Sequence, residues 1–596
     1  MNDHNVFKKS RTLVVLSIFI AVITLFQLSR MGLIENGEAF YQKEYIDIIS
    51  QKNTNVNTQR HPFEKIAIIY DKSATDRAYI FENFKSLLNL YSIDYDLFYA
   101  DKEEPLHDYS LVIAIIGDYA VSPMMIEVFD YLEKGGNVYL PIVPSDNDSF
   151  ISAHSMLGII EKKYVENCST ITDKNGIFGK EGRTFAFSQP VQMRYEVRLR
   201  TDCEVYFSDG KNPLFWERKV GSGTLFASNC DYLSSYESRG VIAYIFYQAL
   251  AKKAGAFILP FYNISTLLVE EFPSPLEPES KILSDLSLSY QSFLDKRFWP
   301  LILDLVGDYG EKPTISYALS YSVNLEGDFT SSIANGILNM YQNEALKRNG
   351  EIATHGYSIR PLGLKGELEE IGWFIPWSSF DRAKQSFEYI FDMLKQHFPN
   401  YNISTYVAPQ GRIGADTIVH LNEIASGVNT VVTRYDYRYN DQYLKSFVQL
   451  DNGIYCYPVT SLYNGIEWNS INSLISLGTM STSLNANTLL ERSDLTFPQF
   501  ETNLRSAYND AAVYKHLHHY TITEATGYLK QYQKSDYSYT IKDGVISIEI
   551  NNWFDGMALS LFSEAKLTSE TCEIEKTQKS CYVIYPKSPS IKIYLS

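Results

Sequence analysis

The sequence contains no Cys-x-x-Cys pair, although six cysteines stand at positions 168, 203, 230, 456, 572 and 581. This absence excludes a zinc knuckle and a thioredoxin-type redox motif, because both depend on two closely spaced thiols. Cys572 and Cys581 flank a polar, turn-like stretch between strand-like segments. They therefore indicate either a disulfide that closes a hairpin outside the cell or two unpaired thiols.

Positive charge is also scarce. Lys and Arg number 53 against 70 Asp and Glu, which gives a formal net charge of -17, and no long basic run or basic-aromatic RNA motif follows the N-terminus. A nucleic acid would be repelled, so we exclude it as a partner, whereas a neutral or cationic polymer would not be repelled. The 45 tyrosines are only weak evidence for sugar binding. Their rings can stack on sugar rings, but tyrosines also fill ordinary half-buried sheets.

The N-terminus carries the localisation signal. Residues 12–28 are uncharged and mostly apolar, and a basic stretch precedes them. The run is just long enough to cross a bilayer, and no small-x-small cleavage site follows it, which favours a retained signal anchor at residues 1–30 over a cleaved signal peptide. We therefore expect a single-pass protein of the cell membrane, with a polar stalk at residues 31–61 and the bulk of the chain on the extracellular face.

The next region, residues 62–255, lacks the glycine-rich loop that cradles a phosphate in many α/β domains. Its first predicted strand, Ile66 to Tyr70, is followed by Asp-Lys-Ser-Ala at residues 71–74. Helical and strand-like patterns then alternate up to about residue 143, which is typical of an open α/β sheet.

Two segments of this region carry a family resemblance. Residues 130–138, Asp-Tyr-Leu-Glu-Lys-Gly-Gly-Asn-Val, and residues 216–223, Trp-Glu-Arg-Lys-Val-Gly-Ser-Gly, resemble the glutamine-amidotransferase-like domains of flavodoxin type. Those enzymes use a cysteine at an elbow after a strand, whereas Gly-Asp-Tyr stands at residues 117–119 here. The resemblance thus implies an open sheet that binds or docks a partner without catalysing a reaction.

A further region, residues 256–535, contains an apolar run from Leu267 to Val269 that ends in Glu270 and Glu271. Strand-like and helical segments then alternate, which predicts a distorted (β/α) barrel. Barrel proteins build their sites at the carboxyl ends of their strands, so two acids at a strand end are candidates for a catalytic base and a metal ligand. The alternative is a pair of solvated acids.

Five segments in this region occur in the order found in a known family. The first is the acid pair at residues 270–271, and the second is a helix followed by a strand at residues 303–316. The third is the segment that leads to His355, at residues 349–355. The fourth is a strand end with the turn after it at residues 407–411, and the fifth is the histidine-rich stretch at residues 515–519. Together they resemble the polysaccharide deacetylases of carbohydrate esterase family 4. They are more similar still to the divergent extracellular deacetylase-like proteins associated with Pel-type exopolysaccharide.

This resemblance implies a metal-dependent deacetylase site. Glu270 would act as the base, Glu271 and His355 would bind a divalent metal such as zinc, and His516 or His519 would protonate the leaving amine. A histidine held by a hydrogen bond at a strand end is the alternative for His355. Surface or core histidines are the alternative for the other two.

The turn after the predicted strand near residue 407 supplies the substrate-binding residues that the resemblance implies, namely Pro409, Gln410 and Arg412.

The chain also departs from the family pattern. Both family aspartates are glutamates, the second metal histidine is replaced by Ile359, and the arginine of the third motif is replaced by Val407, with Arg412 as the nearest substitute. An isoleucine cannot bind a metal, so the metal site is incomplete unless another ligand is recruited.

The last region, residues 536–596, is strand-like and lacks the alternation of strands and helices seen before it. Val545 to Ile550 alternates apolar and polar residues behind a turn-like Lys-Asp-Gly, and Ile591 to Leu595 repeats the alternation. These patterns predict a small antiparallel β-module.

The departures leave two functions open. One is an extracytoplasmic enzyme that deacetylates an N-acetylated amino-sugar exopolysaccharide during synthesis or export, with a ligand such as His519 or Asp328 recruited to the metal. The other is a deacetylase-like fold that has lost catalysis and serves as a polysaccharide-binding or assembly factor beside other exopolysaccharide synthesis and export proteins. A glycoside hydrolase fits less well, because neighbouring residues of a strand point to opposite faces.

Overall fold

The computed structural model describes most of the chain after residue 60. The described residues are His61, Phe63, 65–119, 122–143, 148–165, 167–193, 195–274, 278–321, 324–369, 371–372, 374–434, 447–461 and 465–596. The chain divides into two compact units, Met1–Gln59 and Arg60–Ser596, and all described elements belong to the second.

The prediction of an N-terminal membrane helix is corrected by this structure. Within the described ranges no helix is both long and apolar enough to cross a membrane. The predicted anchor at residues 1–30, and nearly all of the predicted stalk at residues 31–61, lie outside the described residues. The fold class is accordingly a mixed α/β protein with several sheets, and the single-pass membrane localisation is withdrawn.

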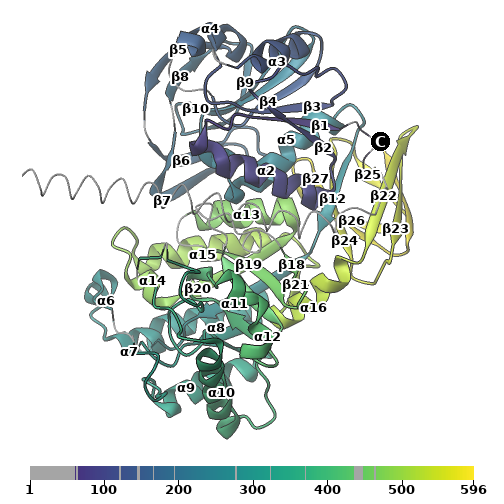
Figure 1. Cartoon of the computed structure of the whole chain (residues 1–596). Helices are drawn as coiled ribbons and strands as arrows, with labels where there is room; N and C mark the ends of the chain where they lie inside the picture. Colours follow the sequence, from purple (N-terminus) through teal and green to yellow (C-terminus); the bar gives the residue numbers. More distant parts are fainter. Residues whose placement is uncertain are drawn as a thin grey trace, which may run out of the picture. The chain divides into compact units, whose positions relative to one another are not determined.

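Nine strands form the first sheet, in the order β2-β1-β3-β4-β11-β10-β9-β6-β7 (Figure 1). The first five are parallel and the others antiparallel. In chain order the strands are β1 (Ile66–Tyr70), β2 (Tyr95–Tyr99), β3 (Leu111–Ile115), β4 (Asn137–Leu140), β6 (Asn167–Asp173), β7 (Thr184–Gln192), β9 (Cys203–Ser208), β10 (Pro213–Val220) and β11 (Gly223–Ser228). β3 reads Leu-Val-Ile-Ala-Ile and is buried throughout, as expected for a central parallel strand.

Four helices accompany this sheet among the described residues. They are α2 (Ala78–Tyr91), α3 (Met124–Glu133), α4 (Asp148–Leu157) and α5 (Arg239–Phe246). In α2 the buried residues Ile80, Phe84, Leu87 and Tyr91 recur at intervals of three and four, so they form one apolar face. The helix ends at Ser92, whose left-handed backbone stops further helical hydrogen bonding. A separate pair of strands, β5 (Ile159–Tyr164) and β8 (Tyr195–Leu199), completes this region.

The second large sheet has nine strands, and seven parallel strands of it close on themselves because the first of them pairs with both the second and the last. They are β13 (Ile264–Glu270), β14 (Pro313–Tyr317), β15 (Glu351–Thr354), β16 (Thr405–Val407), β17 (Thr430–Arg434), β19 (Tyr455–Ser461) and β20 (Thr479–Asn485). The main helices between and after them are α8 (Trp299–Tyr309), α9 (Asn335–Leu346), α10 (Phe380–His397), α13 (Ile466–Leu477), α15 (Phe497–Ala511) and α16 (Ile522–Tyr532). The arrangement is a (β/α) barrel with one common carboxyl end.

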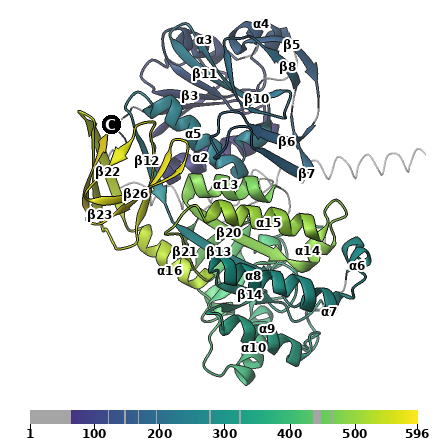
Figure 2. The same ribbon diagram turned by 180° about the vertical axis from the view of Figure 1, so that it is seen from behind.

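The C-terminal residues form two four-stranded sheets that lie next to α16 (Figure 2). One sheet contains β22 (Asp536–Lys542), β23 (Val545–Asn551), β25 (Leu567–Thr568) and β28 (Ser590–Leu595). The other contains β24 (Ala558–Phe562), β26 (Cys572–Gln578), β27 (Cys581–Pro586) and β12 (Phe257–Phe261). Because β12 precedes the barrel in the chain, the β-module contains residues from before the barrel as well as residues from after it.

The six cysteines are all free thiols. Cys572 and Cys581 lie on the adjacent strands β26 and β27, where the register pairs Cys572 with Pro586 and Cys581 with Gln578. The two sulfur-bearing residues therefore do not face each other across the hairpin. Of the two alternatives that the sequence left open, the structure has the unpaired thiols.

The barrel packs on the first sheet through α13, which contacts α5 and lies on the side of the barrel nearest that sheet in both views (Figures 1 and 2). Trp468 of α13 is fully buried, and its ring centroid lies 5.2 Å from those of Phe178 and Phe185 and 5.7 Å from that of Phe207. Its indole nitrogen donates a hydrogen bond of 3.0 Å to the Ser238 hydroxyl. An aromatic cluster thus joins the two sheet systems.

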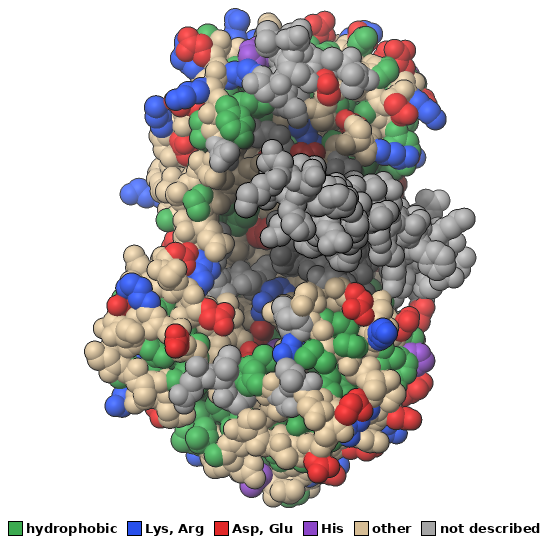
Figure 3. Space-filling view, turned by 60° about the vertical axis from the view of Figure 1, so that its left-hand side comes forward, with side chains coloured by type: hydrophobic (Ala, Val, Ile, Leu, Met, Phe, Trp, Pro, Cys, Tyr) green, Lys and Arg blue, Asp and Glu red, His purple; other side chains and the backbone are tan. Residues whose placement is uncertain are grey.

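Charged side chains of both signs are interspersed over the face shown in Figure 3, where the coloured atoms show no continuous basic patch. This pattern is that of an ordinary solvated surface.

Candidate functional site at the carboxyl end of the barrel

Polar side chains gather where the barrel strands end. Glu270, Arg434 and Asn485 are the last residues of β13, β17 and β20. His355 directly follows β15, and Tyr321 lies four residues after β14. Since all seven strands are parallel, these side chains belong to one end of the barrel, which is the end where barrel proteins place their sites.

Glu270 is buried in an ion pair. It is 4% exposed, and both of its carboxylate oxygens lie 2.8 Å from Nη2 of Arg434. The Ser483 hydroxyl donates a further hydrogen bond to Oε1. Burial by itself raises the pKa of Glu270, but the Arg434 guanidinium, together with His355 and the hydrogen bond from Ser483, outweighs burial and holds the pKa below its usual value. Glu270 is therefore ionised at neutral pH.

Glu271 has a different environment, because its left-handed backbone (φ 53°) turns the chain out of the strand. The Tyr321 hydroxyl donates a hydrogen bond to its Oε1, and Asn485 Nδ2 donates one of 3.1 Å to its Oε2. Burial raises the pKa of Glu271 to about 7 in spite of these donors. Asn487 and Ser274 extend the network, since Asn487 Nδ2 donates to Ser274 Oγ over 2.7 Å.

His355 is 3% exposed, and its backbone nitrogen donates to the carbonyl of Tyr317 over 2.8 Å. Its Nδ1 is buried and has no hydrogen-bond partner within the described part of the chain. Burial lowers the pKa of His355 to about 4, even though the Glu270 carboxylate opposes this shift. The imidazole is therefore neutral at pH 7.

The structure does not bring His516 or His519 to this site. β21 (His518–His519) pairs with Ile264 and Ser265, at the amino end of β13. Five strand residues, or about 17 Å, separate that end from Glu270. The role of leaving-group acid predicted for these histidines is corrected accordingly, because an acid must lie within hydrogen-bond reach of the atom that it protonates.

Each of these histidines has a partner of its own at that end. His516 Nε2 lies 2.9 Å from Glu573 Oε1 in the β-module. His519 Nδ1 lies 3.0 Å from Oε1 of the buried Glu311, which also accepts a hydrogen bond from the Ser265 hydroxyl. These contacts tie the amino end of the barrel to neighbouring elements, a position where polar residues serve stability.

Pro409, Gln410 and Arg412 follow β16 and so lie at the same end of the barrel as Glu270. Pro409 and Arg412 are buried, whereas Gln410 is exposed with a left-handed backbone (φ 54°). The guanidinium that pairs with Glu270 comes from Arg434 and not from Arg412, the substitute considered from the sequence.

The metal that the family resemblance implies does not fit these residues. No group of three or more His, Cys, Asp and Glu side chains that could hold a metal occurs among the residues that the structure places. The Glu270 carboxylate is held by a guanidinium, and Glu271, with a pKa of about 7, is half protonated at neutral pH. Asp328, one of the recruited ligands considered from the sequence, is exposed. A divalent cation would have to displace these partners before it could bind.

Four polar residues of the site are absent from the sequence prediction: Tyr321, Arg434, Ser483 and Asn485. The signal for Arg434 was nevertheless in the sequence, since Thr-Val-Val-Thr-Arg at residues 430–434 is a strand-like run that ends in a charge. Glu270 was predicted as a site residue because it is a charged residue at the end of a strand-like run, and Arg434 fits the same description. The other three carry no comparable local signal.

The raised pKa of Glu271 predicts a pH dependence of stability. The folded state retains a proton on Glu271 up to about pH 7, whereas the unfolded chain releases it near the usual 4.5. The stabilisation is fully present below pH 4.5 and is lost as the pH rises through about 7. Between about pH 5 and pH 8, we expect the free energy of unfolding of the wild type to fall relative to that of Glu271→Gln.

Urea unfolding of the two proteins at several pH values measures this difference. Glu388→Gln, at an exposed position of α10, is the matched control for replacing a carboxylate by an amide. A difference between wild type and Glu271→Gln that stays constant with pH would contradict the assignment.

Fold and site together define a (β/α) barrel protein with a buried carboxylate–guanidinium pair and a neutral histidine at the carboxyl end of the barrel. The family described as "Uncharacterised protein conserved in bacteria (DUF2194)" matches residues 178–583, and the chain belongs to this family. The match covers the strands of the first sheet that come last in the chain, from β7 onward, together with the barrel and most of the β-module. No curated protein matches the chain.

Solved structures similar to parts of the chain include two glycosidases. The β-galactosidase from Bacillus circulans sp. alkalophilus is 15% identical over 33% of this chain and 33% of its own length, with a TM-score of 0.23. The exo-β-1,4-mannosidase from Opitutaceae bacterium strain TAV5 is 12% identical over 31% of this chain and 34% of its own, with a TM-score of 0.22.

A cytoplasmic protein from Salmonella typhimurium LT2 is 13% identical over 31% of this chain and 94% of its own length, with a TM-score of 0.22. The chain thus spans about a third of the length of the two glycosidases. TM-scores this low do not establish a common fold.

Proposed function

We propose that this protein is a polysaccharide-binding or assembly factor, with a deacetylase-like barrel that binds an N-acetylated amino-sugar exopolysaccharide without hydrolysing it through a metal. The observation that carries the proposal is that both candidate metal-site acids are already engaged by protein side chains. Arg434 and Ser483 hold Glu270, and Tyr321 and Asn485 hold Glu271.

The chemistry of the barrel mouth suits a sugar. Sugar hydroxyl and acetamido groups both donate and accept hydrogen bonds, and the carboxyl end of the barrel carries an ionised carboxylate in Glu270 and an acid that can donate in Glu271. A net charge of -17 is compatible with a neutral or partly deacetylated, cationic polymer. Other exopolysaccharide synthesis and export proteins are the partners expected for such a factor.

The decisive experiment measures binding and acetate release on the same preparation. The full-length chain is titrated with a β-linked N-acetylhexosamine oligosaccharide by calorimetry, with and without a chelator, and acetate is measured with and without added zinc. We expect binding that the chelator leaves unchanged and no acetate. Zinc-dependent release of acetate would instead establish a deacetylase, and no binding under any condition would overturn both functions.

Tyr321→Phe tests whether the Glu271 network takes part in binding. Loss of the hydroxyl removes the hydrogen bond to Glu271 and releases that carboxyl from its position. We expect the oligosaccharide affinity to fall about five- to tenfold, corresponding to about one hydrogen bond of roughly 1 kcal/mol. Tyr309→Phe is the matched control, because its hydroxyl donates to Asn509 Oδ1 on the outer helices of the barrel. Equal affinity of the two variants would exclude Tyr321 from the site.

A further inference from the structure

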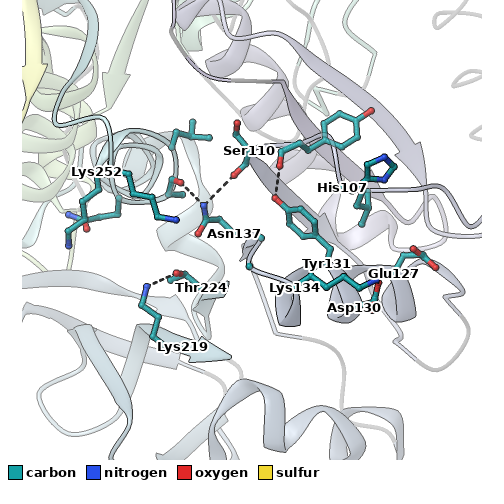
Figure 4. A pocket seen from close by; sticks show the side chains of 18 of the residues that line it. His107, Ser110, Glu127, Asp130, Tyr131, Lys134, Asn137, Lys219, Thr224 and Lys252 are labelled. Carbon is teal, nitrogen blue, oxygen red and sulfur yellow. Dashed lines mark hydrogen bonds and ion pairs between the residues drawn. The ribbon is translucent and has the colours of Figure 1, made fainter. Parts of the chain in front are cut away.

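A polar cavity lies in the first sheet, at the amino-terminal edge of its parallel strands (Figure 4). Its volume is about 600 Å³. Its walls come from the segment before β3, the C-terminal end of α3, the β10–β11 hairpin and the segment after α5. Cavities of roughly 300–1,000 Å³ are typical of sites for small molecules.

The charge of this cavity is opposite to that of the whole chain. Four lysines and two acids line it, namely Lys134, Lys219, Lys252, Lys253, Glu127 and Asp130. Lys134 Nζ lies 2.5 Å from Asp130 Oδ2, so these two charges neutralise each other. Among the lining residues, three lysines then remain against the carboxylate of Glu127. Lys219 Nζ also lies 3.5 Å from Oε1 of Glu217, which is outside the lining, but the Lys219 side chain is 70% exposed, so water screens this pair. In a protein with a net charge of -17, such a local excess of cations favours an anionic ligand.

Two of these lysines converge from different elements. In Figure 4, Lys219 and Lys252 extend toward the region of Asn137 and Thr224. Lys219 Nζ donates to Thr224 Oγ1 over 2.6 Å, which orients its ammonium group. Lys252 Nζ lies 3.5 Å from Glu564 Oε1, but both of these side chains are about half exposed, so water screens the pair.

A buried amide gives an independent indication of a ligand. Gln248 lines the cavity and is 8% exposed, yet neither its Nε2 nor its Oε1 has a hydrogen-bond partner within the described part of the chain. Buried amides are normally hydrogen-bonded, because an unpaired donor or acceptor loses its hydration without compensation. A ligand hydroxyl can satisfy both atoms, since it donates and accepts.

We propose that this cavity binds a small phosphate monoester, with the phosphate between Lys219, Lys252 and Lys253 and the hydroxyl-bearing part at Gln248. Ammonium groups act as point charges that suit a dianionic phosphate without requiring the planar geometry of arginine. The site is independent of the barrel mouth and goes beyond the function proposed for it.

Binding of two probes to the full-length chain tests this assignment. Inorganic phosphate and a hexose 6-phosphate are titrated by calorimetry, and ³¹P line broadening reports on the phosphate itself. We expect the monoester to bind more tightly than inorganic phosphate, with affinities that fall as salt is added. The double variant Lys219→Ala/Lys252→Ala is expected to lose at least tenfold in affinity for both probes.

Gln248→Leu keeps the side-chain volume and removes the amide, so it should weaken the monoester and leave inorganic phosphate unchanged. Lys281→Ala/Lys347→Ala, at two exposed lysines on the barrel, is the matched control for loss of positive charge. Binding of sulfate as tight as that of the monoester, an unchanged affinity in the Lys219/Lys252 variant, or no binding of either probe would each overturn the proposal. A Gln248→Leu variant with unaltered monoester affinity would overturn the assigned orientation.

Discussion

Replacing Trp468 with alanine is expected to lower the free energy of unfolding by about 3–5 kcal/mol, the usual cost of removing a large aromatic side chain from a packed core. The ring is fully buried between α13 and the first sheet, against Phe178, Phe185 and Phe207. Its removal leaves a cavity that the surrounding rings cannot fill, and the Ser238 hydroxyl loses the hydrogen bond that the indole nitrogen donates.

Urea unfolding followed by far-ultraviolet circular dichroism measures this loss. Trp468→Phe is the matched variant, because it retains an aromatic ring in the cluster and loses only part of the buried area and the hydrogen bond to Ser238. We expect its loss to be well under half that of the alanine variant. If both variants unfolded like the wild type, Trp468 would not join the barrel to the first sheet.

Arg434→Met is expected to destabilise the protein by about 3 kcal/mol, because it leaves the Glu270 carboxylate buried and without its countercharge. Glu270 is almost fully buried, and Arg434 contacts both of its oxygens at 2.8 Å. The Ser483 hydroxyl remains as a donor, but one neutral hydrogen bond does not compensate for a buried negative charge.

The double variant Glu270→Gln/Arg434→Met separates the ion pair from simple loss of packing. Removing both charges together leaves no uncompensated group, so the double variant should recover most of the loss. Arg198→Met is the matched control, because Arg198 pairs with Glu161 on the surface, where both side chains are more than half exposed. Its unfolding midpoint should match the wild type within error. A double variant as unstable as Arg434→Met would exclude charge burial as the cause.

Local pattern predicted individual strands well. The strand expected at Ile66 to Tyr70 is β1, and the apolar run that ends in Glu270 is β13, which ends at that residue. Both runs are apolar over consecutive residues, which is the pattern of a parallel strand buried on both faces. The first charged residue after such a run marks its end, because a carboxylate cannot stay in the apolar layer without a partner.

The histidine prediction failed for a physical reason. The order of the segments placed His516 and His519 with the acid pair, but the order along a chain does not specify which end of a strand a later segment will pair with. The hydrogen-bonded register places His518 and His519 against Ile264 and Ser265, at the wrong end of β13 for catalysis at Glu270.

The pairing of Glu270 with Arg434 was equally invisible to sequence reasoning. The two residues are 164 positions apart, and they meet because β13 and β17 run in the same direction in one closed sheet. The pairing also decides the protonation of the site: Glu270 is ionised because a guanidinium reaches it. Glu271, one residue further on, has a pKa of about 7 because burial raises it and the hydrogen bonds from Tyr321 and Asn485 only partly oppose this rise.

By itself, the sequence determined the acidic net charge and the strand that ends at Glu270, since these depend on composition and on neighbouring residues. Only the tertiary structure decided that a guanidinium and neutral donors occupy the two acids, that the histidines of residues 516–519 lie at the other end of the barrel, and that lysines from three segments line one cavity. Those outcomes depend on strand register and direction, which long-range pairing specifies and local pattern does not.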